Sequence, residues 1–505
     1  MESRTKNSIR NMSVALLMQG VSIVLSFVCR TIFAKLLSAE YLGLGGLFSN
    51  IIAVLSLSEL GIGNVIIIHL YKPITDNNEQ RIAELMNFYK KAYNIIGAFV
   101  IGSGLLITPF LGYLVKSDND IPHLGLYFML FIIQTASSYF FAYKQSLLTA
   151  AQKEYICSLV RQGFNILMNV LQIVFLLVTK QYVAYLIVAI VTNIGTNLVL
   201  SMITDKKFAF LKKYKRKSLT KGETKGMLKN VSSMMLHKVG HTVINSTDNI
   251  LISSMVGVIY TGLYSNYLLI MNVITQIATI ALNAMSASIG DFNARKSTEE
   301  RIELFDAMRI FSYWMFGMCA ICFCCLYQPT IELWLGGDYL LGYDIVVIIS
   351  VNFFINGIIR IPSTFCDVSG LYTKTKAKPI AMAIINLVVS IVFLKLWGLV
   401  GVFIGTLVSY LAVAIWIDPY HLYKQEFKMP AIKYYGSLII NVLLVGVVGA
   451  ITYFVTGYIT NYVLKVLVCG VLSNLLFFLI YFRTKEFRFI WNRIKSVFRK
   501  RKQMN

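Results

Sequence analysis

The sequence is poor in charged residues and has no long polar segment that could fold in water. Only 14% of its 505 residues are charged, whereas 57% are hydrophobic, and the mean hydropathy is +0.66. A typical soluble domain has about 25% charged residues. This composition excludes a soluble globular protein and predicts an integral membrane protein whose solvent is the lipid bilayer.

Motifs for catalysis and nucleotide binding are also missing. The sequence has no glycine-rich loop to hold a phosphate and no histidine pair with an intervening acid. It has no soluble domain to bind a nucleotide, which argues against an ATP-driven pump. The longest predicted outer loop, residues 329–342, is too short to form an active site of its own. We therefore expect neither an enzyme nor a bound cofactor.

The eight cysteines do not indicate a disulfide or a metal site. None falls in a predicted outer loop, so no structural disulfide is expected. Cys319, Cys322, Cys324 and Cys325 cluster in one predicted helix, but helical geometry places them on different faces. No histidine or carboxylate joins them, and we interpret them as small apolar residues.

Apolar runs long enough to cross a bilayer extend from one end of the chain to the other. Each is much longer than the strand of a membrane barrel, and about 20 apolar residues suffice for a helix to span the hydrocarbon core. The sequence predicts an all-α integral membrane fold of about fourteen transmembrane helices, at 12–35, 43–70, 92–115, 123–148, 156–178, 182–204, 231–257, 262–289, 308–328, 343–370, 379–396, 399–417, 436–457 and 461–482.

The distribution of basic residues predicts the orientation. Placing both termini inside puts most of the 47 Lys and Arg residues in inner loops and in the tail. Only Lys35, Lys116, Lys180, Lys395 and Lys465 then lie at outer helix ends. This positive-inside pattern accounts for the net charge of +23 without a nucleic-acid partner, and the basic tail at 483–505 is expected to lie on anionic lipid.

An internal repeat predicts two lobes. The segment 45–50, Gly-Gly-Leu-Phe-Ser-Asn, opens the second predicted helix, and 260–266, Tyr-Thr-Gly-Leu-Tyr-Ser-Asn, opens the eighth. We expect two parallel six-helix lobes around a central cavity, with two additional helices. The predicted segments are an N-lobe at 1–204, a basic cytoplasmic loop at 205–230, a C-lobe at 231–417, the extra helices at 418–482 and the tail at 483–505.

Polar residues at helical spacing form seams along several predicted helices. Such seams avoid lipid, so they are expected to line the cavity, as in alternating-access transporters. They include Arg30 on the first helix, Glu59 on the second, His237, Lys238, His241, Asn245 and Asp248 on the seventh, Asn272, Gln276 and Asn283 on the eighth, and Asn352, Asn356, Arg360 and Asp367 on the tenth.

The three cations and three anions in these seams have two interpretations. Arg30, Lys238 and Arg360 could pair with Glu59, Asp248 and Asp367 and hold the lobes together, or they could line a hydrated pathway. The uncharged residues could likewise form ordinary contacts between helices. His237 and His241 could relay protons or simply pack. As a set, the seams favour a hydrated pathway.

The sequence resembles a known family. Arg30, the segment 36–44 (Leu-Leu-Ser-Ala-Glu-Tyr-Leu-Gly-Leu) and the segment 57–63 (Leu-Ser-Glu-Leu-Gly-Ile-Gly) look like bacterial polysaccharide repeat-unit flippases, and 246–249 and 262–266 fit as well. These flippases belong to the multidrug, oligosaccharidyl-lipid and polysaccharide exporter (MOP) superfamily. The helix count and the repeat extend the resemblance over the whole chain.

The resemblance implies a multi-pass protein of the bacterial plasma membrane that carries an undecaprenyl-diphosphate-linked oligosaccharide to the outer leaflet, among other membrane proteins of polysaccharide assembly. Arg30, Arg360 and Lys238 are then candidates for binding the diphosphate. The sugar-contacting candidates are Asn245, Asn272, Gln276, Asn283, Asn352 and Asn356. Glu59, Asp248, Asp367, His237 and His241 are cavity or coupling candidates, with Na⁺, H⁺ and the membrane potential left open as the driving force.

Other functions remain open at this stage. A cation-coupled multidrug exporter of the same fold would favour an anionic cavity, whereas the first helix carries Arg30 and no acid in its seam. A flippase for a peptidoglycan lipid precursor would share the diphosphate and the polyprenyl tail. A glycosyltransferase would need a catalytic residue on a substantial loop, and a scaffold would tolerate loss of both seam arginines.

Overall fold

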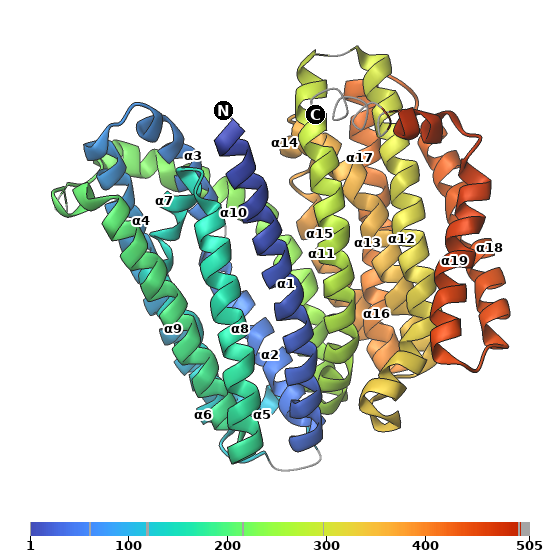
Figure 1. The fold of residues 1–505 in the computed structure, drawn as a ribbon, viewed down its shortest axis with the longest axis horizontal. Coiled ribbons are helices and arrows are strands. Elements are labelled where there is room, and N and C mark those ends of the chain that lie inside the picture. The colour runs from blue at the N-terminus through green and yellow to red at the C-terminus, as the bar shows by residue number, and fades with distance from the viewer. Residues whose placement is uncertain are drawn as a thin grey trace. The chain divides into compact units, whose positions relative to one another are not determined.

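The computed structural model describes residues 2–59, 62–117, 121–214, 217–295, 297–492 and 495. Side chains are described within these ranges except at 2–16, 58, 64, 229–230, 232–238, 241, 245, 281, 283–295 and 372–373. All regular elements of this part of the chain are helices, and it contains no strand (Figure 1). The predicted all-helical fold is confirmed.

Contacts divide the chain into two compact units, residues Met1–Ser265 and Asn266–Asn505. Unit 1 contains the helices α1 (Glu2–Leu36), α2 (Ala39–Leu55), η1 (Ser56–Glu59), α3 (Ile62–Thr75), α4 (Glu79–Ile107), η2 (Thr108–Phe110), α5 (Leu111–Leu114), α6 (Leu124–Ala142), α7 (Gln145–Ala150), α8 (Glu154–Thr179), α9 (Tyr182–Lys207), η3 (Ala209–Lys212), α10 (Lys221–Leu251) and η4 (Ile252–Val256). The next helix, α11 (Val258–Arg295), begins in unit 1 and continues into unit 2.

Unit 2 contains most of α11 and the remaining helices. These are α12 (Thr298–Leu335), η5 (Gly337–Tyr339), α13 (Tyr343–Val368), α14 (Tyr372–Thr375), α15 (Lys378–Trp397), α16 (Leu399–Ser409), η6 (Tyr410–Ala414), α17 (Ile415–His421), η7 (Leu422–Phe427), α18 (Ile432–Gly457) and α19 (Tyr462–Tyr481). Two of these elements, α17 and η7, extend the predicted twelfth helix beyond residue 417.

Twelve helices of the described chain are long and apolar enough to cross a membrane. Two of the fourteen predicted helices, the second and the seventh, are not among these twelve. The second, predicted as one helix over 43–70, is broken into α2, η1 and α3, where the polar and glycine-containing sequence from Ser56 to Gly63 interrupts the apolar run. The seventh corresponds to α10, which is regular but carries too many polar residues to count among the twelve.

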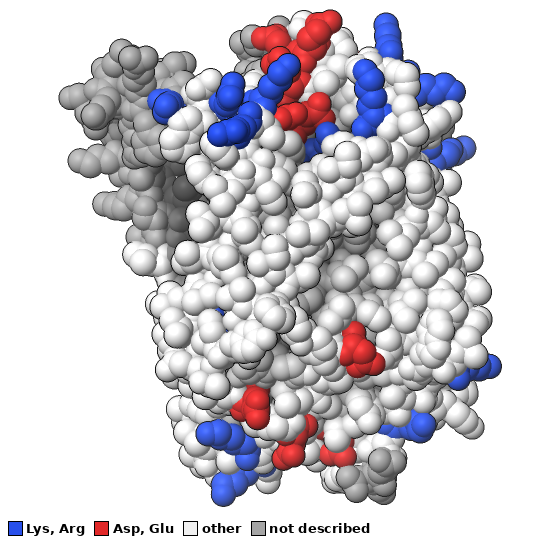
Figure 2. Space-filling model, turned by 90° about the vertical axis from the view of Figure 1, so that its right-hand side faces the viewer, with Lys and Arg blue, Asp and Glu red and all other residues white. Residues whose placement is uncertain are grey.

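The surface of the molecule agrees with a multi-pass membrane fold. On the face shown in Figure 2, charged side chains gather toward the two ends and leave a broad uncharged band between them. Large apolar side chains such as Ile95, Leu106 and Phe454 are exposed in the long helices. Exposed apolar surface on this scale is expected where lipid replaces water as the neighbour.

The beginnings of α2 and α11, which carry the two copies of the sequence repeat, pack directly against each other inside unit 1. A Cβ atom added at Gly43 of α2 would lie 1.9 Å from the Val258 carbonyl oxygen, and one added at Gly262 of α11 would lie 2.0 Å from the Ala39 carbonyl oxygen. Only glycine allows the two backbones to approach this closely. The beginnings of α2 and α11 therefore cross at a glycine contact.

This contact explains where unit 1 ends. Because α10 packs against α2 and α3, and α11 begins at the glycine crossing, the chain up to Ser265 joins unit 1. The lobes predicted from the repeat instead separate at 205–230. They remain a prediction about repeated architecture, which the grouping of contacts does not test.

Candidate functional site

In unit 1, Arg30 of α1 donates a hydrogen bond from Nη2 to the hydroxyl of Ser265 in α11. Ser265 lies one turn after Gly262, so the glycine crossing places its hydroxyl beside α1. The adjacent Cys29 contacts Oε1 of Gln172 with its thiol at 3.7 Å, which fixes α1 against α8. Arg30 is partly buried at this point in the bundle.

An aromatic cluster stands next to Arg30. Tyr182 and Tyr185 lie within its electrostatic range, and Phe33, one turn further along α1, meets both rings edge-on at 5.8 and 4.9 Å. Tyr127 packs edge-on against Tyr182 at 5.1 Å. Tyrosines combine an apolar face with a hydroxyl, so this cluster can contact both sugar rings and apolar groups.

In unit 2, the polar seam of α13 is centred on Arg360. Its Nε donates to Oδ1 of Asn356 at 3.3 Å, and its Nη1 donates to the hydroxyl of Thr279 on α11 at 3.1 Å. Asn356 in turn donates to the hydroxyl of Tyr410 at 2.8 Å. All of these described partners are uncharged, so they orient the guanidinium without neutralising it.

The Tyr410 hydroxyl reaches this seam from an irregular element. Tyr410 begins η6, a π-helical turn between α16 and α17. Single π-helical turns within α-helices are frequent at functional sites because they redirect side chains. One turn away along the seam, Asn352 donates to the Phe403 carbonyl at 2.9 Å, while its own side-chain oxygen is buried with no hydrogen-bond partner among the described residues.

The carboxylate candidates lie in different surroundings. Glu59 ends η1, and its Oε1 accepts a hydrogen bond from the hydroxyl of Tyr93 at 2.7 Å. Asp248 of α10 is buried, with 8% of its surface exposed, whereas Asp367 lies exposed near the end of α13. These two aspartates therefore do not share one environment.

The remaining predicted site residues fall into two groups. Asn272 and Gln276 are exposed on α11. The side chains of His237, Lys238, His241, Asn245 and Asn283 lie outside the described part of the structure. Their predicted roles stay predictions.

Four residues that the sequence interpretation did not select lie beside the predicted site residues. Ser265 lies in the repeat motif, and that position could have indicated its role. Tyr89 and Tyr93 lie four residues apart on α4, a spacing that predicts a shared helix face. Tyr410 gave no sequence signal, because the π-helical turn that redirects it is set by packing.

Matching ion pairs tie the ends of α9 and α17 into their units. In unit 1, Lys144 Nζ lies 2.6 Å from Oδ2 of Asp205 at the end of α9. In unit 2, Lys378 pairs with Asp418 of α17, and the Cys366 thiol donates to the Asp418 carbonyl at 3.3 Å. The two aspartates follow directly after the sixth and twelfth predicted helices, which the predicted repeat would make equivalent.

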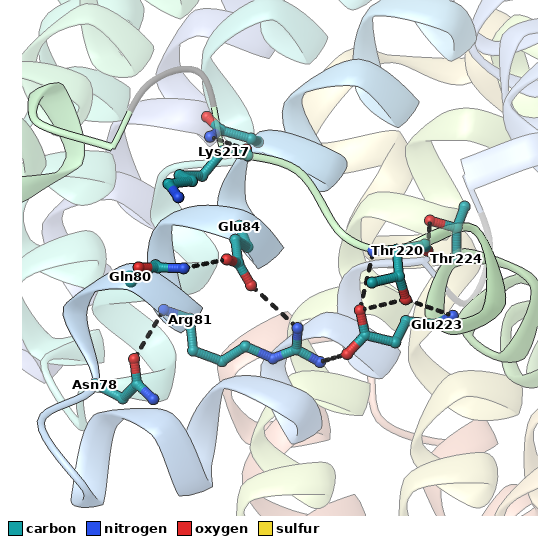
Figure 3. Close-up of polar contacts among 9 residues, drawn as sticks. Asn78, Gln80, Arg81, Glu84, Lys217, Thr220, Glu223 and Thr224 are labelled. Carbon is teal, nitrogen blue, oxygen red and sulfur yellow. Dashed lines mark hydrogen bonds and ion pairs between the residues drawn. The ribbon is translucent and has the colours of Figure 1, made fainter.

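A polar network joins the beginnings of α4 and α10, at the end of the helices predicted to face inward (Figure 3). Arg81 reaches Oε2 of Glu84 at 3.1 Å and Oε1 of Glu223 at 2.6 Å. Thr220 caps α10 and also donates to Glu223 at 2.7 Å. Nearby, Asn87 donates to the Lys217 carbonyl at 2.8 Å, which holds the basic linker against unit 1.

Neutralising Glu223 is expected to loosen this network at every pH near neutrality. The hydrogen bond from Arg81, followed by that from the Thr220 hydroxyl, lowers the pKa of Glu223 from its ordinary value of 4.5 to about 2. A carboxylate whose pKa is lowered in the folded protein makes its full contribution to stability at pH values above its ordinary pKa. That contribution disappears as the pH falls toward the lowered pKa. Compared with the wild type at the same pH, Glu223→Gln should therefore speed amide hydrogen exchange in the first turn of α10. The factor should be the same from about pH 5 to about pH 8.

The matched control is Glu79→Gln on α4, which removes an exposed acid outside the network. An effect of Glu223→Gln that changed across this pH range, or an equal effect of Glu79→Gln, would contradict the assignment.

The fold is that of known membrane transporters. A solved structure of the lipid II flippase MurJ in an inward closed conformation superimposes with a TM-score of 0.67, covering 93% of this chain and 99% of that chain at 16% identity. An inward-facing multidrug resistance MATE family transporter of the MOP superfamily covers 79% of this chain and 96% of that chain, with a TM-score of 0.59 and 14% identity.

A third solved structure agrees with these two. It is a mutant of the MATE transporter VcmN from Vibrio cholerae, covering 85% of this chain and 99% of that chain, with a TM-score of 0.54 and 14% identity. No family model matches the sequence, and no curated protein matches it. These likenesses establish the multi-pass transporter fold, and the cargo must be argued from the site.

Proposed function

We propose that this protein is a flippase that moves a polyprenyl-diphosphate-linked oligosaccharide from the cytoplasmic to the outer leaflet of a bacterial plasma membrane by alternating access. The protein would act in cell-surface polysaccharide biosynthesis beside other membrane proteins of that pathway. The proposal assigns no catalytic residue and no cofactor. It rests on the polar seams and is supported by the fold likeness to a lipid II flippase.

The observation that carries the proposal is the environment of Arg360. Its described hydrogen-bond partners, Asn356 and Thr279, are neutral, so the guanidinium keeps its charge within the helices of unit 2. A charge in such a position is costly unless it serves a ligand or water. The planar guanidinium can bind two phosphate oxygens at once, which suits a diphosphate better than a lipophilic cation.

In this proposal Arg30 is a second phosphate contact, and Lys238 supplies a further point charge. The Asn356–Tyr410 pair, together with Asn352, Asn272, Gln276, Asn245 and Asn283, would offer amide and hydroxyl groups to the sugars. Asp248, Asp367, His237 and His241 remain cavity or coupling candidates. We propose that both termini face the cytoplasm, following the distribution of the basic residues.

A second candidate cargo is the peptidoglycan lipid precursor. It is favoured by the superposition on MurJ, which is described as a lipid II flippase and has a higher TM-score than the MATE transporters above. Both cargoes contain a diphosphate and a polyprenyl chain, so the Arg360 argument applies to either. Only the headgroup attached to the diphosphate distinguishes them.

The cargo is tested by assaying the purified protein in proteoliposomes with three probes in parallel. These are a fluorescent polyprenyl-diphosphate oligosaccharide, the corresponding disaccharide-peptide precursor and a lipophilic cation. We expect the first probe to reach the opposite leaflet and the cation to stay in place. Movement of the precursor alone would shift the assignment to the second candidate, and transport of the cation alone would contradict both flippase assignments.

A further inference from the structure

Glu59 stands where the second predicted helix is broken. It is the last residue of η1, the 3₁₀ turn that follows the α-helix α2. The Glu59 carboxylate is partly buried, and its described hydrogen-bond partners are tyrosine hydroxyls, that of Tyr93 at 2.7 Å and that of Tyr139, rather than a cation. A carboxylate held by a hydroxyl group can gain or lose a proton without breaking an ion pair.

The Tyr93 hydroxyl is one member of a longer chain of hydroxyl groups. It accepts a hydrogen bond from the Tyr89 hydroxyl at 2.9 Å, which in turn accepts one from Ser146 of α7 at 3.2 Å. Tyr89, Tyr93 and Ser146 are 1%, 4% and 9% exposed. Three buried hydroxyl groups thus lead from Glu59 to the first turn of α7, each donating toward the carboxylate.

Ser146, the hydroxyl group farthest from Glu59 in this series, lies near the side of unit 1 that is predicted to face inward. Ser146 follows the partly exposed Lys144 and Gln145. Lys144 itself pairs with Asp205, at the end of α9 and just before the basic linker. The chain therefore connects a carboxylate in the middle of the second predicted helix with the side on which the basic residues gather.

The surroundings hold the hydroxyl groups in line. The Tyr89 and Tyr93 rings pack edge-on at 4.5 Å, and Tyr139 packs edge-on against Tyr93 at 5.7 Å while donating to Ser56 at 2.8 Å. A Cβ atom added at Gly63 would lie 3.0 Å from the Tyr89 hydroxyl oxygen. Glycine at this position leaves the space that the chain of hydroxyl groups occupies.

Other titratable groups lie on the helices that pack against η1. The helices packed against η1 are α2, α4 and α10. Tyr89 and Tyr93 of α4, together with Tyr139 of α6, interact electrostatically with Glu59, while Lys90 and Lys91 on α4 are exposed. On α2 the titratable residues are Glu40 and Tyr41, which lie at its start. On α10 they include Asp248 and also His237, Lys238 and His241, whose side chains lie outside the described part of the structure.

We propose that Glu59 is a proton-binding site loaded from the predicted inner side through Ser146, Tyr89 and Tyr93. This proposal deepens the proposed flippase function, on which it rests, by naming the proton as the coupling ion and α4 as its route. A carboxyl group placed at a helix break and reached by buried hydroxyl groups has the elements needed for a proton relay.

The transfer balances along the chain. The Tyr93 O–H bond breaks as its proton passes to Oε1 of Glu59, and Tyr93 receives the proton of Tyr89. Tyr89 receives the proton of Ser146, and Ser146 takes one from hydronium on the inner side. The net change is one solvent proton consumed and one carboxylate converted to a carboxylic acid, and no side chain on the path keeps a charge.

The test is infrared difference spectroscopy of the full-length protein in lipid after a jump in pH. We expect a carboxylic-acid band to appear after a jump to lower pH, and we expect Glu59→Gln to abolish it. Tyr93→Phe keeps the ring but removes the link, so it should slow the appearance of this band by about a hundredfold, the lower end of what a positioned proton-transfer group contributes.

A matched control separates the relay from general packing. Tyr143→Phe removes the hydroxyl of another buried tyrosine that packs in the same apolar cluster as Tyr89 and Tyr93, and it should leave the rate unchanged. A band absent from the wild type, or an unchanged rate in Tyr93→Phe, would overturn the relay. Because this readout needs no cargo, it can succeed or fail independently of the three-probe flipping assay.

Discussion

Lys378→Met is expected to destabilise the protein by about 3–5 kcal/mol, the usual effect of removing one partner of a buried ion pair. Asp418 is only 1% exposed, and its carboxylate faces Lys378, whose side chain is 13% exposed. Without the ammonium group, this carboxylate would be left charged among packed helices. The end of α17 would then lose its attachment to α15.

Two further variants make this test specific. Lys144→Met removes the lysine of the ion pair in unit 1, but its partner Asp205 has 36% side-chain exposure, so we expect a loss of about 1 kcal/mol or less. Lys378→Met combined with Asp418→Leu removes both charges and should recover most of the stability. The free energy of unfolding in mixed detergent micelles measures all three variants, and equal losses for Lys378→Met and Lys144→Met would contradict the account.

Gly262→Ala should separate α2 from α11 and lower stability by about 1–3 kcal/mol, the usual cost of overpacking. The added methyl group would lie 2.0 Å from the Ala39 carbonyl oxygen, which belongs to backbone and cannot rotate away. Because Ser265 follows one turn later, the displacement should also remove its contact with Arg30. We therefore expect Gly262→Ala to impair flipping as well as lower the thermal unfolding midpoint.

Gly43→Ala should behave in the same way, because its methyl group would lie 1.9 Å from the Val258 carbonyl oxygen. Gly102→Ala on α4 is the matched control, since a Cβ atom at that position meets nothing within 4 Å. Its thermal midpoint should stay constant or rise slightly, because alanine favours a helix more than glycine does. A Gly262→Ala protein as stable as Gly102→Ala would show that the crossing is looser than described.

Much of the fold could be predicted because bilayer thickness fixes helix length. The predicted spans at 182–204, 343–370 and 461–482 match α9, α13 and α19 closely. The second helix was predicted wrongly as continuous, because its hydropathy hides the break at η1. The Gly262 motif indicated a repeat, but not that its two copies touch, since distance between distant segments is set by tertiary packing.

The site was only partly predictable for a related reason. Helical spacing selected Asn356 and Arg360 as neighbours on one face, and the structure joins them by a hydrogen bond. Spacing along one helix says nothing about partners from another, so Thr279 and Tyr410 were not paired with them. The tyrosine partner of Glu59 was missed for the same reason, since it comes from α4.

The central claim is that cationic seams bind the diphosphate of a lipid-linked cargo. The most direct test compares flipping of the fluorescent polyprenyl-diphosphate oligosaccharide by the wild type, by Arg30→Ala combined with Arg360→Ala, and by Arg161→Ala, which removes an exposed arginine from α8. Hydrogen bonds to charged groups contribute about 1.5–3 kcal/mol each, so each seam arginine should account for about tenfold to a hundredfold in rate. The account predicts near-complete loss in the folded double variant with Arg161→Ala unaffected, whereas wild-type flipping by the double variant would contradict it.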